Sequence, residues 1–237
     1  MFDKLRADFI QTFIDGDRWR VLITSLGVTL KLTFFALLLG VALGVLVAVI
    51  RSSHDQMAEQ HRKSPLMSFA NALCKLYLTV IRGTPAMVQL LIMYFVIFAS
   101  STNTTLVATL TFGINSGAYV AEIFRGGIMA IDKGQMEAGR SLGLGYVQTM
   151  KDIIIPQAFK SVLPSLVNEL ISLLKETSIC GYIGLNELTR GGDIIRGTTF
   201  DALLPLLGVA LIYLALVLVI SYFIGILERR LRASDHR

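Results

Sequence analysis

The sequence predicts an all-α, polytopic membrane protein with about five transmembrane helices. Of its 237 residues, 54% are hydrophobic and only 16% are charged, whereas soluble domains carry about 25% charged residues. The apolar residues fall in long blocks rather than being dispersed along the chain. A block of about 18 or more apolar residues with almost no charge is typical of a membrane-spanning helix.

The chain begins with a segment that is too polar to cross a membrane. Within residues 1–19, Phe2, Leu5, Phe9 and Phe13 recur at helical spacing, and charged and polar side chains fall on the opposite face. We expect this segment to be an amphipathic helix lying in the membrane interface. A transmembrane domain is then expected over residues 20–237.

The first span is expected at about residues 22–50. Gly40 and Gly44 lie within it as two small residues four positions apart, a spacing that lets a neighbouring helix approach closely. The polar segment 52–65 that follows predicts a loop.

The remaining spans are less uniform. A second apolar stretch at 65–99 is interrupted by Arg-Gly-Thr-Pro at 82–85, and a membrane helix tolerates proline only where its neighbours satisfy the freed backbone groups. The other predicted segments are three spans at 106–129, 161–183 and 202–227, and a polar loop at 185–201.

The distribution of basic residues predicts the orientation. Basic residues flanking the spans favour the cytoplasmic side, and Lys or Arg residues occur in the C-terminal tail, in and beside the 52–65 segment, and in the 131–160 segment. Five spans place the two termini on opposite sides. We therefore expect an extracytoplasmic N-terminus and a cytoplasmic C-terminus.

Several other classes of function are disfavoured. The net charge of +5 comes mainly from Lys and Arg beside apolar blocks, and no basic stripe with interleaved aromatic residues indicates nucleic-acid binding. Cys74 and Cys180 lie in or beside apolar stretches and are expected to behave as small hydrophobic residues. The sequence indicates no metal site and no catalytic residue.

The segment 131–160 is too polar for the bilayer and carries four glycines, at 134, 139, 143 and 145. Composition alone is compatible with an ordinary cytoplasmic loop. The pattern predicts a helix, a glycine turn and a second helix, and Pro156 can begin the next helix, where its missing N–H has no cost.

The stretch EAGRSLGLGYVQTMKDIIIP, at 137–156, resembles the EAA motif of ABC-importer permeases. It departs from the motif at Gly139, where the family has alanine and where glycine could loosen the first short helix, and at Ile155, where the family has leucine. The matching positions are Glu137, Ala138, Gly143, Ile153 and Pro156.

Three further stretches resemble the polar amino-acid uptake family of these permeases. They are IRGTPAMVQL at 81–90, SGAYVAEIFRGGI at 116–128 and NELISLLKETSI at 168–179. The resemblance covers nearly the whole chain after the N-terminal segment.

The resemblance implies the fold and partners of a type I ABC importer. Two permease subunits, identical or merely similar, would form the path through the inner membrane. Two ATPase subunits, which use ATP and Mg²⁺, would dock on coupling helices formed by Glu137, Ala138, Gly139, Gly143, Ile153 and Pro156. An extracytoplasmic binding protein would deliver the amino acid. This chain has no Gly-rich phosphate loop followed by Lys-Ser or Lys-Thr, so we expect it to be neither an enzyme nor a cofactor-binding subunit.

Ionisable and polar groups within spans are candidates for holding the substrate, because they are costly in lipid. A carboxylate suits the ammonium of an amino acid, and hydroxyl or amide groups suit its carboxylate. The candidates are Thr84, Asn115, Tyr119, Glu122, Asn168, Glu169 and Thr177.

Structural roles stay open for several of these groups. Glu122 could instead form a salt bridge with Arg125, and Glu169 could form an interhelical hydrogen bond or ion pair. Asn115 and Tyr119 could serve helix packing.

Two other classes of membrane protein compete with an ABC permease. A secondary transporter driven by an ion gradient often has inverted repeats and broken helices, but this chain is short, has an odd number of predicted spans and shows no convincing repeat. A non-transporting membrane anchor or sensor would not need polar groups within its spans. The sequence does not indicate which amino acid is carried.

Overall fold

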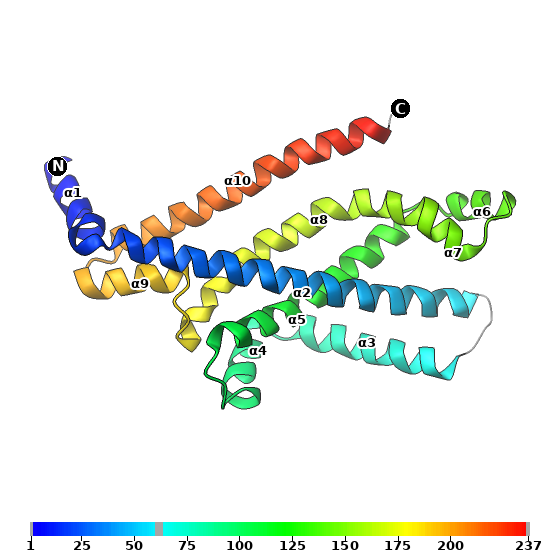
Figure 1. Ribbon diagram of the computed structural model, residues 1–237, viewed down its shortest axis with the longest axis horizontal. Coiled ribbons are helices and arrows are strands. Elements are labelled where there is room, and N and C mark those ends of the chain that lie inside the picture. Colours follow the sequence, from blue (N-terminus) through cyan, green and yellow to red (C-terminus); the bar gives the residue numbers. More distant parts are fainter. Residues whose placement is uncertain (1, 60–63, 236–237) are drawn as a thin grey trace. The chain divides into compact units, whose positions relative to one another are not determined.

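The computed structural model describes residues 2–59 and 64–235, and this part of the chain consists of helices and their connections (Figure 1). The chain forms two compact units, each assembled from separate stretches. The first unit contains Met1–Ala36, Ala86–Phe112 and Ile171–Phe223. The second unit contains Leu37–Pro85, Gly113–Leu170 and Ile224–Arg237.

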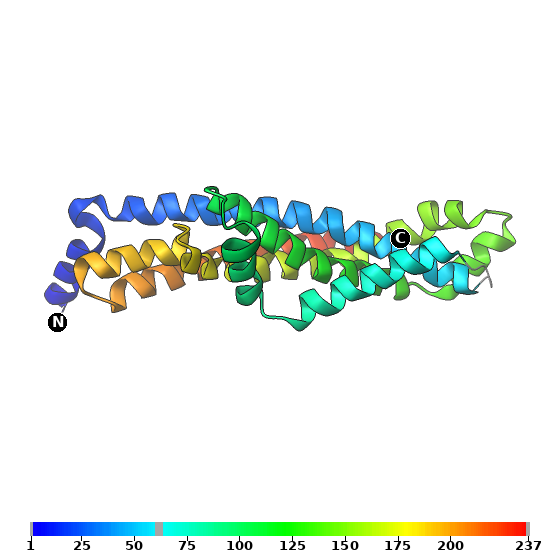
Figure 2. The ribbon, with the colours of Figure 1, turned by 90° about the horizontal axis from the view of Figure 1, so that it is seen from below.

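Ten α-helices are present in the described residues, and α2 is a single uninterrupted helix (Figure 2). In chain order they are α1 (Phe2–Phe9), α2 (Trp19–Glu59), α3 (Pro65–Gly83), α4 (Ala86–Ile92), α5 (Thr104–Met129), α6 (Lys133–Ser141), α7 (Tyr146–Thr149), α8 (Ile155–Glu176), α9 (Leu188–Thr199) and α10 (Leu203–Asp235).

Three of the described helices are long and apolar enough to cross a membrane, namely α2, α5 and α10. A fourth crossing is present if α3 and α4, which are separated by the break at Thr84–Pro85, count as one span. The predicted interruption of the second span is therefore observed. The predicted span at 161–183 falls on α8 and a 3-10 turn, Thr177–Ile183, and α8 carries Glu169 and Lys175.

Two predicted loops contain helix instead. α2 continues as a helix through Glu59, so the expected loop at 52–65 is wrong as far as Glu59; residues 60–63, which include the basic Arg62 and Lys63, lie outside the described part. No proline or glycine interrupts residues 52–59, so nothing in the local sequence ends the helix. The expected loop at 185–201 contains α9.

The predicted N-terminal helix is interrupted. α1 is followed by a π turn, Ile10–Ile14, and a 3-10 turn, Asp15–Asp17, in which Gly16 has φ +64°. Thr12 is buried, and Phe13 packs against residues of α9 and α10. Part of this segment therefore belongs to the core of the first unit.

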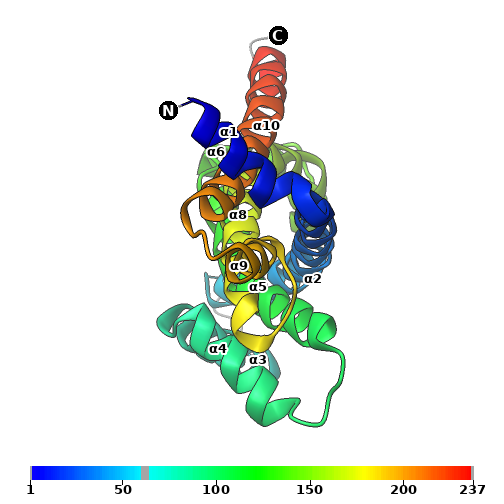
Figure 3. The same cartoon turned by 90° about the vertical axis from the view of Figure 1, so that its left-hand side faces the viewer.

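The core of the first unit is built by α2, α9 and α10, which Figure 3 shows from one end. Leu22, Leu188, Ile195 and Val209 form its buried cluster. A Cβ on Gly192 would lie 2.4 Å from Val209 Cγ2, so α9 and α10 pack too closely for a larger residue there.

In the second unit, α2 and α5 cross at very short range. A Cβ on Gly40 would lie 2.9 Å from Ser116 Cβ, and one on Gly44 would lie 2.5 Å from Val120 Cγ1. On α5, a Cβ on Gly113 would lie 2.5 Å from Leu39 Cδ2. The close helix approach predicted from Gly40 and Gly44 is confirmed.

Helix α3 completes the core of the second unit. Cys74 and Leu78 of α3 pack with Val47 of α2 and Ala118 of α5 in one buried cluster. The Tyr77 hydroxyl donates a hydrogen bond of 2.6 Å to the backbone carbonyl of Ile114. Helices α2, α3 and α5 therefore fix one another in the part of the chain that carries several predicted site residues.

Candidate functional site

The segment 131–160 has the predicted helix, glycine turn and helix. Asp132 caps α6 by accepting a hydrogen bond of 2.7 Å from Gly134 N. After α6, Gly143 adopts φ +79°. Its N–H donates to Arg140 O at 2.9 Å, and Leu144 N–H donates to Gly139 O at 3.0 Å. These two bonds define a Schellman motif, which requires the left-handed backbone that glycine adopts without strain.

Gly139 is the position at which the sequence departs from the EAA motif, and it is buried. A Cβ there would lie 2.5 Å from Thr149 Cγ2 and 2.8 Å from Thr149 Oγ1. Glycine thus lets α6 pack closely on the buried Thr149 of α7 rather than only loosening α6. The branched side chain of Thr149 occupies the space that an alanine methyl group would take.

The other predicted coupling residues lie on or near the surface. Glu137 and Ala138 are exposed on α6, Ile153 is half-buried and Pro156 is exposed. Pro156 is the second residue of α8, but a π turn, Met150–Ile154, joins α7 to α8 directly. Helical structure therefore runs from Tyr146 to Glu176 without a break, and Pro156 does not begin an isolated helix.

A cavity of about 590 Å³ lies among α6, α7, the π turn and the ends of α2 and α5. Asp55 of α2 and Arg125 of α5 line it and form an ion pair of 3.2 Å. Met136 of α6 and Met150 of the π turn line it from the coupling segment. The coupling segment therefore shares this cavity with two of the long helices.

Among the predicted substrate residues, Glu169 of α8 has a close polar partner on another helix. The Ser116 hydroxyl of α5 donates a hydrogen bond of 2.7 Å to Glu169 Oε1. Ser116 is fully buried, and Glu169 is partly buried. This pair joins α5 to α8 within the second unit.

Glu122 has a different partner from the one considered from the sequence. Its Oε1 lies 2.7 Å from Arg51 Nη1 and 3.8 Å from Arg82 Nη1, while Arg125 pairs with Asp55. The alternative of a Glu122–Arg125 salt bridge is therefore wrong. Arg51 and Glu122 are 71 residues apart, so local spacing could not reveal the pair.

The remaining predicted side chains differ in their exposure and in their partners. Tyr119 is partly exposed, and the guanidinium of Arg82 lies 5.7 Å from the centre of its ring. Asn115 is buried and Asn168 is exposed. The Thr84 hydroxyl, just beyond the end of α3, donates to Val80 O of that helix at 2.8 Å. Thr177 belongs to the first unit and donates to Leu174 O at 2.7 Å.

Sequence reasoning missed Glu187, which is fully buried in the first unit. It caps α9 by accepting hydrogen bonds from Thr189 N at 2.8 Å and Arg190 N at 2.7 Å, and Tyr213 Oη donates to it at 3.2 Å. Burial raises the pKa of Glu187, and these donors act in the opposite direction. Glutamate is not among the favoured N-cap residues, so the sequence did not indicate that a helix begins after Glu187.

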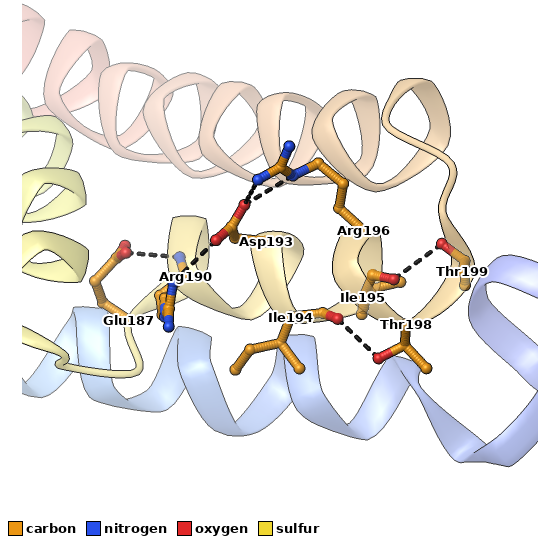
Figure 4. A network of polar contacts seen from close by, with 8 residues as sticks. All are labelled: Glu187, Arg190, Asp193, Ile194, Ile195, Arg196, Thr198 and Thr199. Carbon is orange, nitrogen blue, oxygen red and sulfur yellow. Dashed lines mark hydrogen bonds and ion pairs between the residues drawn. The ribbon is translucent and has the colours of Figure 1, made fainter.

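The outer face of α9 is polar. Asp193 lies between Arg190 and Arg196 and pairs with both, at 2.9 Å to Arg190 Nη1 and 2.8 Å to Arg196 Nε (Figure 4). Such i, i+3 pairs stabilise a helix only slightly. Among the described residues, no group of three or more His, Cys, Asp or Glu side chains is arranged to hold a metal ion.

The chain is similar to known transport proteins over most of its length. It is 39% identical over 207 residues to the putative glutamine transport system permease protein GlnP of Rickettsia typhi, covering 86% of this chain and 89% of the relative. It is 36% identical over 217 residues to the arginine transport system permease protein ArtQ of Bacillus subtilis, covering 90% and 94%.

A solved structure supports the same relationship. The crystal structure of an amino acid ABC transporter with histidines contains a chain that is 39% identical, with a TM-score of 0.80, covering 89% of this chain and 94% of that chain. The sequence model of a protein family, the binding-protein-dependent transport system inner membrane component, matches residues 64–233 of this chain. The chain belongs to the family of binding-protein-dependent transport system inner membrane components.

Proposed function

We propose that this chain carries a polar amino acid across the membrane and that Glu169 holds the ammonium group of that amino acid. Family membership makes the chain a permease subunit of an amino-acid ABC importer, in which a separate subunit hydrolyses ATP and a binding protein supplies the substrate. Its relatives are named for glutamine and arginine. No finding favours a transporter driven by an ion gradient.

The contact between Ser116 and Glu169 carries the proposal. A carboxylate within a membrane helix is costly unless it meets a cation or several donors. Ser116 supplies one donor at 2.7 Å. An ammonium group of the substrate is a cation of the kind that stabilises such a carboxylate. Asn115, Tyr119 and Asn168 are proposed to contribute further polar contacts.

The proposed site and the coupling segment share two helices. Ser116 lies on α5, whose Arg125 lines the cavity beside α6 and the π turn. Glu169 lies on α8, which continues directly from α7 through the π turn. We propose that Glu137, Ala138, Gly139, Gly143, Ile153 and Pro156 form the surface on which the ATPase docks. Movement of the docked segment would then reach Ser116 and Glu169 through rigid helices.

The assembly and its orientation are proposed on the same basis. A second permease subunit, identical or similar, would complete the path. The basic residues of the tail and of 131–160 favour a cytoplasmic C-terminus, and the ATPase would bind its ATP and Mg²⁺ on that side. The N-terminal segment 1–19 would lie at the outer membrane interface ahead of the permease domain at 20–237.

The test is a Glu169→Gln substitution in the importer reconstituted with its ATPase and binding protein. Loss of one charge-assisted contact should reduce import and substrate-stimulated ATP hydrolysis together by about 10-fold to 100-fold. Basal ATP hydrolysis and assembly should persist. Glu228→Gln makes the same chemical change near the end of α10 and serves as the control.

The outcomes separate a substrate role from a structural one. A Glu169→Gln complex that fails to assemble would identify a structural ion pair. A complex with unchanged import would remove Glu169 from the substrate site. A wild-type complex that imports no amino acid would overturn the proposed function as a whole.

A further inference from the structure

An open cavity of about 460 Å³ lies in the second unit, on the exposed side of α3. Arg51 of α2, Lys75, Thr79 and Arg82 of α3, and Glu122 of α5 line it. Its volume is within the range of pockets that bind small molecules, roughly 300–1,000 Å³. Three basic side chains and one carboxylate give its lining an excess of two positive charges.

That excess is not neutralised within the described part of the chain. Glu122 is the acidic partner of both Arg51 and Arg82. Arg51 Nε is buried and has no hydrogen-bond acceptor among the described residues, and Lys75 forms no ion pair with any of them. Arg82 uses one nitrogen toward Glu122 at 3.8 Å, and its side chain is 45% exposed. A guanidinium has five N–H donors, so most of those on Arg82 are available.

The polar side chains of α3 form one stripe. Lys75, Thr79 and Arg82 are spaced by four and then three residues, which places them on one face of the helix. The neighbouring face presents exposed apolar side chains, including Leu73, Leu76 and Val80. Lys75 is ten residues beyond the start of α3, or about 15 Å along the helix axis. An ammonium within a membrane-spanning helix is costly in lipid and is expected to face water or a ligand.

We propose that this cavity binds the carboxylate of the transported amino acid, through Lys75 and Arg82. The proposal rests on the proposed function and adds a second charged contact to Glu169. Arg51 and Glu122 are positioning residues, since Glu122 accepts from Arg51 and draws Arg82 toward the cavity. The ring of Tyr119 lies 5.7 Å from the Arg82 guanidinium and restrains Arg82 through a cation–π contact.

This assignment changes the role expected of Glu122. A carboxylate that already faces two guanidinium groups has little capacity left for a substrate ammonium. The cavity therefore favours the anionic end of a zwitterion, and Glu169 is left as the carboxylate for the cationic end. A phosphate group of a lipid presents similar oxyanion chemistry, so the experiment must separate these two sources.

The experiment measures binding of a radiolabelled amino acid that the wild-type importer transports. The permease–ATPase complex is placed in nanodiscs of phosphatidylcholine, and the α-carboxamide of the same amino acid is the competitor. Lys75→Gln removes the charge, Lys75→Arg keeps it, and Lys31→Gln changes an exposed lysine of α2 that does not line the cavity.

Wild-type complex should prefer the amino acid over its carboxamide. Lys75→Gln should reduce this preference by about 10-fold, the effect of losing one contact to a charged group. Lys75→Arg and Lys31→Gln should retain it. Import should fall in Lys75→Gln and recover in Lys75→Arg. The same loaded binding protein is used in every assay, so a difference in import reflects the permease.

Three results would overturn the proposal. In the first, the Lys75→Gln complex keeps the full preference for the amino acid over its carboxamide. In the second, Lys75→Gln weakens binding of the acid and of the carboxamide equally, and this result indicates a structural role for Lys75. In the third, the effect of Lys75→Gln appears only when the nanodiscs contain anionic phosphatidylglycerol, which would assign the cavity to a lipid headgroup. In each case normal wild-type import of the amino acid would leave the proposed function intact.

Discussion

At the scale of single residues, the partners of charged and small side chains come from distant parts of the sequence. Glu122 pairs with Arg51, and Gly44 packs on Val120. The residue types that carry function were recognisable, because carboxylates within spans are costly wherever they lie. Their partners were not, since contacts across 53 or 71 residues depend on how the helices cross.

Gly139→Ala should destabilise the coupling segment because the new methyl group would lie 2.5 Å from Thr149 Cγ2. Overpacking of this kind costs about 1–3 kcal/mol. We expect faster hydrogen exchange in α6 and α7 and weaker binding of the ATPase. Thr149→Ala removes the two closest atoms and should rescue the Gly139→Ala variant. A double variant no better than Gly139→Ala alone would show that this contact does not limit the packing.

At the scale of helices, apolar blocks predicted the elements well and polar stretches predicted them poorly. Local patterns predicted the first span, the close helix approach at Gly40 and Gly44, the break near Pro85 and the helix–turn–helix at 131–156. The helical residues 52–59 and α9 were missed because their polar composition resembles that of a loop. α9 is helical because Glu187 caps it and because its Gly191 and Gly192 pack against α2 and α10.

Gly143→Val should uncouple ATP hydrolysis from import. Gly143 lies at φ +79°, where a β-branched residue is strained by roughly 1–3 kcal/mol, so the turn between α6 and α7 should change shape. We expect import to fall while ATP hydrolysis continues. Gly145→Val is the matched control, because Gly145 has φ −68° and ψ 158°, which valine adopts readily. Normal import with normal ATP use in the Gly143→Val complex would show that this turn does not couple the two.

At the scale of the whole molecule, the two units carry different features. The second unit holds the coupling segment, the Ser116–Glu169 contact and the cationic cavity of α3. The first unit holds α9, the buried Glu187 and most of the apolar α10. Transmission from the ATPase to the proposed substrate residues can therefore take place within the second unit, along α5 and α8. The interleaving of the units was not predictable, because each is built from stretches far apart in the sequence.

The orientation of the chain in the membrane is the remaining prediction at this scale. Basic residues of the tail and of 131–160 favour the cytoplasmic side, whereas the N-terminal segment has a balance of charges. A thiol introduced by Ser234→Cys should react with a membrane-impermeant maleimide only after the cells are permeabilised, and one introduced by Asp3→Cys should react in intact cells. The native Cys74 and Cys180 are buried, so background labelling should be low. Labelling of the Ser234→Cys variant in intact cells would reverse the assignment, and it would also place the coupling segment on the side where no ATPase could reach it.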